Sequence, residues 1–335
     1  MRSLRLYGSA DLRLVDEPAP TPGPDEELVR VSAVGICGSD LHWYAESGIG
    51  DAVLSRPLVL GHEAGGVIVG GPRTGQRVAI DPAIPCDQCE QCAAGHQHLC
   101  LALRFAGHGT TDGAFRELLA WPSRCLVPVP DVLDDEDVAM LEPLGVALHG
   151  LGLGDVRPGS RVGVFGCGPI GLFLVQLARA AGATTILATD VLPHRVDAAR
   201  RAGATTAVLV RDGAGLDELN DATDGRGIDV AFEAAGENDA FETGIAVAAP
   251  LGQVIVVGIP SVDRTTFTAS VARRKGLTIK LSRRMNRVYP RAVSLVERGV
   301  IDVQSVVTAS LPLDRYDEAF GVASRREGLK VVVRP

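Results

Sequence analysis

No long apolar run occurs in the 335 residues of this sequence, whereas a helix needs roughly 18 or more apolar residues in succession to cross a bilayer. The opening residues, MRSLRLYGSADLRLVDE, lack the apolar core of a secretory signal peptide. Internal repeats and low-complexity segments are absent as well. These absences argue against a membrane-spanning or exported protein, and we expect a cytoplasmic one.

Basic residues are fewer than acidic ones. The sequence has 33 Lys and Arg and 41 Asp and Glu, which gives a formal net charge of −8. That balance argues against general nucleic-acid binding. A hydrophobic content of 46% and a charged content of 22% are ordinary for a globular protein, and the length predicts two domains. Cysteines are few, only seven. Without an export signal we interpret them as reduced thiols or metal ligands rather than disulfides.

Residues 161–190 have the pattern of a dinucleotide-binding unit. An apolar strand, 162–165, precedes a glycine turn, a helix-period run at 172–181 and a second strand at 185–189. The turn fits G-x-G-x-x-G and consists of Gly166, Cys167, Gly168, Pro169, Ile170 and Gly171. The first glycine permits a tight turn, the second lets the backbone approach a pyrophosphate, and the third lets helix and strand pack closely. The helix N-terminus offers N–H groups to the phosphates.

An acidic residue, Asp190, ends the second strand 19 residues after Gly171, about where the ribose-binding acid of such a unit falls. A carboxylate there accepts hydrogen bonds from ribose hydroxyls and repels a 2′-phosphate, which predicts NAD rather than NADP. The nearby Arg195 leaves some room for NADP. A glycine-rich turn in another kind of α/β protein is the alternative interpretation.

Strands and helices alternate after Asp190. The sequence predicts helices at 193–202 and 238–248 and strands at 208–210, 228–233 and 253–258. Apolar strands that alternate with helices imply a parallel sheet covered on both faces. Eight basic residues and no acidic one lie between Arg273 and Arg291. We interpret this basic run as partly a solvated face and partly a counter-charge for cofactor phosphates; a preference for an anionic substrate is the alternative.

A possible metal site is divided between distant segments. Cys37 follows a predicted strand at 28–34, and His62 and Glu63 stand together in a glycine-bounded turn. A thiolate, an imidazole and a carboxylate make a plausible three-ligand zinc site with an open position, the arrangement of catalytic zinc. Glu142 is a candidate fourth ligand, or an acid that grips zinc-bound water. An inert buried thiol and a core histidine are the alternatives.

Four cysteines in the pattern C-x₂-C-x₂-C-x₇-C are expected to close around a structural zinc with no open position: Cys86, Cys89, Cys92 and Cys100. An iron–sulfur cluster uses similar spacings and is the alternative. Three nearby histidines, His96, His98 and His108, are interpreted as solvated or loop residues. The remaining cysteines, Cys125 and Cys167, are interpreted as packing residues.

Together these motifs resemble the zinc-dependent medium-chain dehydrogenases over essentially the whole chain. The segments 37–42 and 142–144 look most like the polyol (sorbitol, or L-iditol) dehydrogenase branch. The resemblance implies an α/β protein with a Rossmann doubly wound parallel sheet in residues 146–280. It also implies a mostly-β GroES-like catalytic domain with a structural zinc lobe, in residues 1–145 and 281–335. A homodimer or homotetramer is expected.

The resemblance also implies roles for individual residues. Cys37, His62 and Glu63 would bind the catalytic zinc, and Glu142 would hold the zinc-bound water or substrate, or enter the shell itself. Ser39 would relay the hydroxyl proton, with His42 near the outer end of the relay. Beyond the glycine turn, Asp190 and Arg195, the expected cofactor contacts are Val257, Gly258, Ser282 and Arg283.

The substrate pocket departs from the family pattern at two positions. Arg284 falls where the family's substrate-contacting arginine does. The tyrosine after the relay histidine is Trp43 here, and the tyrosine after the substrate arginine is Met285. Both changes remove a hydroxyl, which places sorbitol itself in doubt and favours another polyol, an aldonate such as idonate, or a less polar secondary alcohol.

The expected reaction is NAD-linked oxidation of a secondary alcohol to a ketone, in a cleft between the two domains. Threonine 3-dehydrogenase, or another zinc alcohol dehydrogenase, is the enzymatic alternative. A non-catalytic nucleotide-binding redox sensor or scaffold is the alternative of another class, and it predicts an empty catalytic metal site. A zinc-free quinone reductase would have no use for these ligands.

Overall fold

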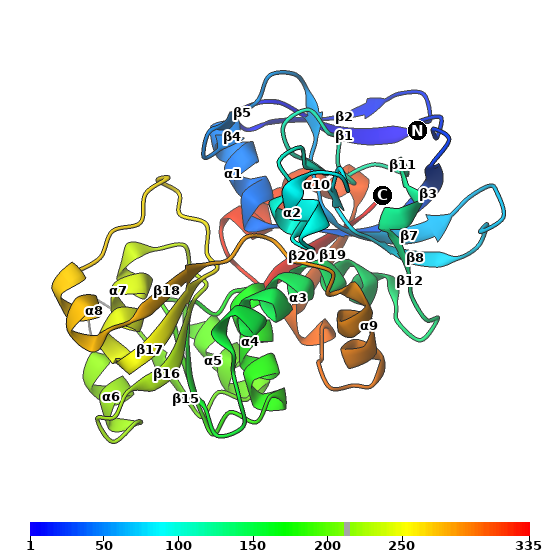
Figure 1. The fold of residues 1–335 in the computed structure, drawn as a ribbon. Coiled ribbons are helices and arrows are strands. Elements are labelled where there is room, and N and C mark those ends of the chain that lie inside the picture. The colour runs from blue at the N-terminus through cyan, green and yellow to red at the C-terminus, as the bar shows by residue number, and fades with distance from the viewer. Residues whose placement is uncertain (211–214) are drawn as a thin grey trace. The chain divides into compact units, whose positions relative to one another are not determined.

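Two compact units make up the chain in the computed structural model, which describes residues 1–210 and 215–335 (Figure 1). Unit 1 comprises Met1–Pro143 and Asn286–Pro335, and unit 2 comprises Leu144–Met285. Each unit has its own sheet and its own hydrophobic core.

Unit 2 is built on a six-stranded parallel sheet with the order β15-β14-β13-β16-β17-β18. The strands are β13 (Arg161–Phe165), β14 (Thr185–Asp190), β15 (Thr206–Leu209), β16 (Ile228–Glu233), β17 (Ala248–Val256) and β18 (Thr278–Leu281). This order, with the reversal next to β13, is that of dinucleotide-binding folds. The predicted doubly wound parallel sheet is therefore confirmed.

Helices flank this sheet (Figure 1). They are α4 (Pro169–Ala180), α5 (Pro193–Ala202), α6 (Leu216–Asp221), α7 (Asn238–Val247) and α8 (Ala269–Lys275), while α3 (Asp135–Gly154) runs across the boundary between the units. The predicted helix 193–202 is confirmed residue for residue. α4 begins three residues before the predicted 172, because Gly168 is its N-cap and Pro169 occupies the first helical position, where proline needs no N–H partner.

Unit 1 is mostly β-structure around a seven-stranded sheet with the order β12-β8-β7-β3-β20-β19, in which β11 also pairs with β3. Its strands are β3 (Glu26–Gly35), β7 (Glu63–Ile68), β8 (Arg77–Ile80), β11 (Leu118–Pro122), β12 (Leu126–Pro128), β19 (Val307–Pro312) and β20 (Lys330–Arg334). Because β19 and β20 belong to this sheet, residues 286–335 fold together with residues 1–143 in the same unit.

Smaller elements complete unit 1. A three-stranded sheet contains β1 (Arg2–Gly8), β2 (Asp11–Asp16) and β6 (Leu58–Val59). Two short pairs are β4 (Gly48–Ile49) with β5 (Ala52–Val53), and β9 (Ala83–Ile84) with β10 (Arg104–Phe105). The helices are α1 (Gly38–Glu46), α2 (Glu90–Ala93), α9 (Tyr289–Glu297) and α10 (Tyr316–Ser324), with 3₁₀ turns η1 (Gln97–Leu99), η2 (Ser123–Cys125), η3 (Gln304–Val306) and η4 (Leu313–Arg315).

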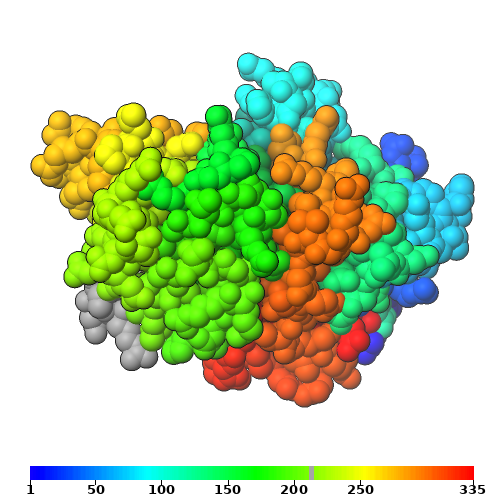
Figure 2. Space-filling model, turned by 90° about the horizontal axis from the view of Figure 1, so that it is seen from below, coloured from blue at the N-terminus to red at the C-terminus, as the bar shows by residue number. Residues whose placement is uncertain are grey.

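The helix α9 is fixed to the unit 1 sheet. The orange segment that contains it lies beside the teal part of unit 1 in Figure 2. The buried hydroxyl of Tyr289 donates to the carbonyl oxygen of Ile80 over 3.0 Å. In the part of the chain that the structure describes, no helix has both the length and the apolar character of a membrane span.

Two lysines of the basic run have packing roles inside unit 2. Lys275 Nζ donates to the carbonyl oxygens of Ile245, Ala246 and Ala248, at 3.0, 2.6 and 2.8 Å. These carbonyls lie at the C-terminal end of α7, where helix carbonyls lack partners within the helix. Lys280 Nζ likewise donates to Leu153 O at 2.7 Å. Neither lysine therefore belongs to the solvated face that we expected of the run.

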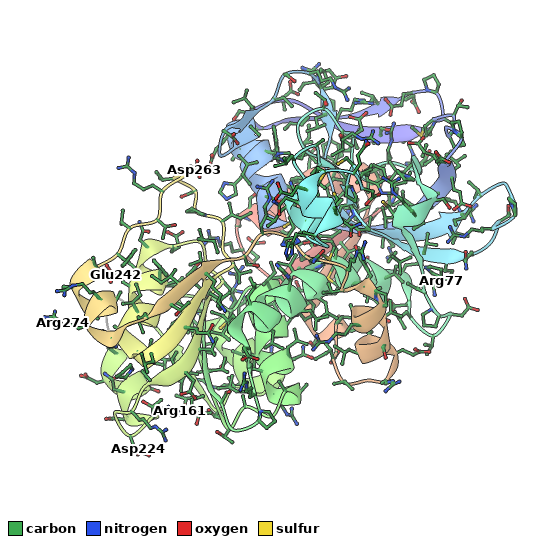
Figure 3. The ribbon with its side chains drawn as sticks, in the orientation of Figure 1. Arg77, Arg161, Asp224, Glu242, Asp263 and Arg274 are labelled. Atoms are coloured by element: carbon green, nitrogen blue, oxygen red, sulfur yellow. The ribbon has the colours of Figure 1, made fainter. Side chains whose placement is uncertain are left out.

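Replacement of Lys275 by methionine should lower the free energy of unfolding by about 1–3 kcal/mol, because three carbonyls lose a charged donor in hydrogen bonds of which two are partly buried. The matched control is Arg274→Met on the same helix, whose exposed side chain is labelled in Figure 3; it should change stability by less than about 0.5 kcal/mol. Urea unfolding of both variants measures the difference, and equal effects would contradict the capping role.

Candidate metal centres and nucleotide site

Three predicted metal ligands meet in unit 1. The ligand atoms of Cys37, His62 and Glu63 all lie within 4.8 Å of one another. Their positions follow from the antiparallel pairing of β3 with β7, in which Gly35 lies opposite Glu63. Cys37 lies two residues after the end of β3 and is the N-cap of α1. The sequence analysis placed Glu63 in a turn. In the structure it is instead the first residue of β7.

The glycine opposite Glu63 leaves room for its carboxylate. A Cβ atom added to Gly35 would lie only 2.1 Å from Glu63 Oε2, closer than any real contact allows. Glycine is thus required at this point of β3 by the approach of the acid.

Asp40 connects the two segments of the cluster. Its carboxylate accepts hydrogen bonds from the backbone N–H of Cys37, at 2.9 Å, and of Gly61, at 3.0 Å. Asp40 Oδ1 also lies 3.5 Å from His62 Nδ1. A carboxylate on one ring nitrogen fixes the imidazole and leaves the other, Nε2, for a metal. Burial lowers the pKa of His62, but the charges of Asp40 and Cys37 outweigh burial and raise this pKa well above its usual value.

Lys330 is the counter-ion of Glu63. Its Nζ lies 2.7 and 2.6 Å from the two carboxylate oxygens and also donates to Ile36 O at 3.0 Å. Both side chains are buried. Burial lowers the pKa of Lys330, but the negative charge of Glu63 outweighs burial and raises it.

Glu142 is buried in α3 and lies outside the set of three ligand atoms. Burial raises the pKa of its carboxyl to about 8, while the charge of His62 opposes and that of Glu63 adds to this rise. Its role as a zinc ligand, directly or through water, stays a prediction.

The donor set suits zinc. One sulfur, one imidazole nitrogen and one carboxylate oxygen are ligands that catalytic Zn²⁺ accepts, and three protein ligands leave a position open. The Asp40 carboxylate behind His62 is the outer partner that metal-bound histidines commonly have.

The predicted relay residues, Ser39 and His42, and the predicted pocket residue Trp43 lie on α1. Ser39 Oγ is 3.4 Å from His62 Nε2, so this serine adjoins the cluster. His42 Nδ1 is 3.4 Å from Glu46 Oε1. Trp43 is 2% exposed and contacts the His108 ring edge-on, with 5.4 Å between ring centroids. A contact of Trp43 with substrate stays a prediction.

The second group of candidate metal ligands in unit 1 consists of the four cysteines of the C-x₂-C-x₂-C-x₇-C pattern, whose sulfurs lie within 4.8 Å of one another. Backbone N–H groups lower the pKa of Cys89 to about 6, whereas burial and the neighbouring thiols raise that of Cys92 to about 12. The two thiols therefore differ in how readily they lose a proton. A divalent cation would stabilise all four as thiolates, and four sulfurs with no open position suit a structural zinc.

Of the nearby histidines, His98 is buried rather than solvated.

The predicted nucleotide residues of unit 2 gather at the carboxyl edge of its sheet. Arg161, which is labelled in Figure 3, lies at the opposite, amino edge of this sheet. Its Nη2 atom is 2.7 Å from Asp229 Oδ1. Gly166 follows β13 with φ of +103°, a conformation that favours glycine. A Cβ on Gly171 would lie 1.9 Å from Gly166 O, so helix and turn pack closely. A Cβ on Gly168 would meet only Arg195 Nη1 at 3.8 Å, which leaves open space beside the turn.

Asp190 is held at the end of β14 by backbone donors. Its carboxylate accepts from Cys167 N at 2.8 Å and from Leu192 N at 2.9 Å. Arg195 Nη1 lies 3.9 Å away. The negative charge is therefore fixed beside the glycine turn.

Other predicted cofactor contacts follow β17 and β18, which pair with Val256 opposite Leu281. Val257 and Gly258 come directly after β17, and Ser282 follows β18 and donates its N–H to Val256 O. Ser282 Oγ is buried and has no hydrogen-bond partner among the described residues. The Ser282 hydroxyl can therefore bond to a ligand at this edge of the sheet. Together with the open space beside the glycine turn, it fits the binding of a dinucleotide. Arg283 is exposed, and Arg284 has a positive φ of 56°.

The sequence interpretation missed Asp40 and Lys330. Asp40 has a local signal, because an acid three residues after an N-cap typically bonds back to the cap. Lys330 has none, since it is 267 residues from Glu63 in the chain.

Loss of the lysine should leave a buried anion uncompensated. Lys330→Met should lower the free energy of unfolding of the metal-free protein by about 3–5 kcal/mol. The double variant Lys330→Met/Glu63→Gln should recover much of that loss, because no charge is then left without a partner. Chemical denaturation after chelation measures both. A double variant no more stable than Lys330→Met would contradict the ion-pair account.

Glu142 should make the stability of the metal-free protein depend on pH. Its pKa rises on folding from 4.5 to about 8, so the folded state binds the proton more tightly and stability falls as pH rises between these values. The slope is at most about 1.4 kcal/mol per pH unit. Denaturation of the chelated protein and of Glu142→Gln over this interval tests it. Parallel curves for the two proteins would contradict the raised pKa.

Comparisons with known proteins agree with this geometry. The family model "Alcohol dehydrogenase GroES-like domain" matches residues 23–131, and the model "Zinc-binding dehydrogenase" matches residues 169–298. The chain is 34% identical to sorbitol dehydrogenase of Bacillus subtilis (strain 168), over 100% of this chain and 97% of that protein. It is 28% identical to the solved structure of L-idonate 5-dehydrogenase from Escherichia coli, with a TM-score of 0.90 and coverage of 100% and 98%.

Two further solved structures contain nicotinamide cofactors. A zinc-binding dehydrogenase from Sinorhizobium meliloti 1021, 31% identical with a TM-score of 0.90 and coverage of 100% and 99%, is bound to NADP. An alcohol dehydrogenase from Escherichia coli CFT073, 27% identical with a TM-score of 0.91 and coverage of 100% and 99%, is complexed with NADH. The expected family is thereby confirmed, and the chain belongs to the zinc-dependent medium-chain dehydrogenases, in the polyol dehydrogenase branch.

Proposed function

We propose that this enzyme oxidises a secondary alcohol of the polyol or sugar-acid type to a ketone, with NAD⁺ as the hydride acceptor. The observation that carries the proposal is the convergence of Cys37, His62 and Glu63 within 4.8 Å. The similarity to sorbitol dehydrogenase and to L-idonate 5-dehydrogenase supports this substrate class, because both names denote polyhydroxylated compounds.

We assign two zinc ions to unit 1. Cys37, His62 and Glu63 would hold the catalytic ion, with Glu142 bound directly or through water, and the four cysteines of the second cluster would hold the structural ion. Zinc bound at the first site would act as a Lewis acid that lowers the pKa of an alcohol hydroxyl. Asp40 keeps the imidazole of His62 turned toward that position.

Ser39 would accept the hydroxyl proton, which is passed outward to His42. The 3.4 Å separation of Ser39 Oγ from His62 Nε2 supports this assignment, since it puts the serine next to the ligand cluster. Trp43 and Arg284 would contact the substrate. With Trp43 and Met285 in place of two tyrosines, the pocket suits a polyol, an aldonate or a less polar secondary alcohol.

The glycine turn would bind the pyrophosphate, and Asp190 would accept hydrogen bonds from the ribose hydroxyls. The fixed carboxylate supports NAD over NADP, because a 2′-phosphate would meet its negative charge. The adjacent Arg195 is the residue through which NADP would retain some affinity. Val257, Gly258, Ser282 and Arg283 would complete the cofactor contacts.

We also propose a homodimer or homotetramer in the cytoplasm. Leu251 and Leu281 are 82% and 77% exposed, and Leu281 ends β18 at the edge of the sheet. An apolar, unpaired edge supports association. All seven cysteines are free of disulfides, which suits a reducing compartment. Light scattering of the purified protein tests the assembly.

A kinetic panel tests the reaction. NADH formation should occur with a polyol or an aldonate and exceed turnover of threonine and simple secondary alcohols, and kcat/KM should be higher with NAD⁺ than with NADP⁺. Cys37→Ser should abolish turnover, because a metal ligand is lost, while Cys125→Ser in the same unit should retain it. Full activity of Cys37→Ser, or no turnover of any alcohol, would contradict the proposal.

A further inference from the structure

One face of α1 extends from the ligand cluster toward solvent. Ser39, His42 and Glu46 follow one another at spacings of three and four residues, so they lie on the same side of the helix. Ser39 Oγ is 3.4 Å from His62 Nε2 at the buried end, and His42 Nδ1 is 3.4 Å from Glu46 Oε1 at the other. Exposure of the side chains increases outward, from 22% for His42 to 52% for Glu46.

We propose that Glu46 is a positioning residue that holds His42 in the Nδ1–H tautomer and leads the proton of the substrate alcohol out to solvent. The proposal deepens the proposed function and rests on it for the identity of the proton. The carboxylate can only accept a hydrogen bond, so Nδ1 must be the donor of the pair. The other ring nitrogen, Nε2, then has a free lone pair.

The reaction releases one proton for each alcohol oxidised. The alcohol and NAD⁺ give a ketone, NADH and H⁺: the C–H bond breaks with its electron pair, which goes to the nicotinamide as hydride, and the O–H bond breaks to release the proton. That proton travels through Ser39 and is accepted at His42 Nε2. The imidazolium then gives up its Nδ1 proton to Glu46 or to water beside it, which leaves the ring in the Nε2–H form. Before the next turnover Nδ1 must take a proton from solvent and Nε2 must lose its proton to solvent, so that one proton is released in each cycle.

An acid at position 46 does not stabilise the helix α1. It is the last residue of α1, where the helix dipole disfavours a negative charge, and the last turn contains no basic residue. Even for a protonated histidine, an acid on the C-terminal side of its partner is the less favourable order for an i,i+4 pair. The position is nevertheless well defined, because Ala10 N donates to Tyr44 O at 2.7 Å and Ser9 Oγ donates to Ala45 O.

The tautomer is measured by ¹⁵N NMR of histidine-labelled protein, with the His42 signals assigned through His42→Gln. The expected result is Nδ1–H at neutral pH in the wild-type protein and a shift toward Nε2–H in Glu46→Gln. The control Glu318→Gln removes a similarly exposed pair with Arg315 from α10 and should leave the His42 signals unchanged. A wild-type His42 in the Nε2–H form, or no change in Glu46→Gln, would overturn the proposal.

Kinetics give the second readout. Glu46→Gln should lower kcat about tenfold, which is less than the roughly 10²–10⁴-fold that a general acid–base group itself contributes, and should change KM little. The solvent deuterium isotope effect on kcat should rise, and added buffer base should restore part of the rate. A purely structural residue would show neither. An unchanged kcat that does not respond to buffer would overturn the proposal, whereas the expected tautomer in a protein inactive on every alcohol would support the positioning role and contradict the proposed reaction instead.

Discussion

The register of β3 against β7 is the constraint on which the rest of unit 1 depends. Pairing of Gly35 with Glu63 puts the residues after one strand beside the residues that open the next. A shift of one residue would turn every side chain of a strand to the opposite face, and Cys37 and His62 would no longer face a common point. Gly35 enforces the arrangement, since any side chain there would collide with the Glu63 carboxylate.

Charge around the cluster is arranged in opposed pairs. Asp40 faces His62 on one side, and Lys330 neutralises Glu63 on the other. Among the described residues Glu142 forms no ion pair, and burial raises the pKa of its carboxyl although the charges of His62 and Lys330 oppose this rise. The cluster thus carries two ion pairs, while the buried carboxyl of Glu142, outside the three ligand residues, has a raised pKa. The buried ion pair with Lys330 is what distinguishes Glu63 from Glu142.

The sequence was sufficient where chemistry is encoded locally. The glycine turn, the four-cysteine spacing and the helix α5 were all predicted, because turn geometry, metal coordination and helix capping act over a few residues. The sequence was not sufficient where a partner is distant. Lys330 is brought to Glu63 only by the pairing of β20 with β3, and Lys275 reaches the end of α7 only through tertiary packing. No local pattern distinguishes such lysines from surface ones. The sequence analysis also did not predict the helix α1. Glycines stand on either side of its N-cap, Cys37, and the Asp40 cap was therefore not recognised.

The same logic explains why unit 2 followed expectation so closely. Its strands and helices alternate, each turn carries its own glycine or proline, and the parallel order leaves the functional residues at one edge. Its departures are shifts at element ends, as at the starts of α4 and β17, and three elements that the sequence analysis did not predict, α6, α8 and β18.

Anomalous scattering at the zinc absorption edge, from crystals of the protein grown with zinc, tests the central claim most directly. The account predicts two peaks in each chain, one among Cys86, Cys89, Cys92 and Cys100 and one between Cys37 Sγ and His62 Nε2. A single peak at the four cysteines, with Glu63 still paired to Lys330 and no metal beside Cys37, would contradict it.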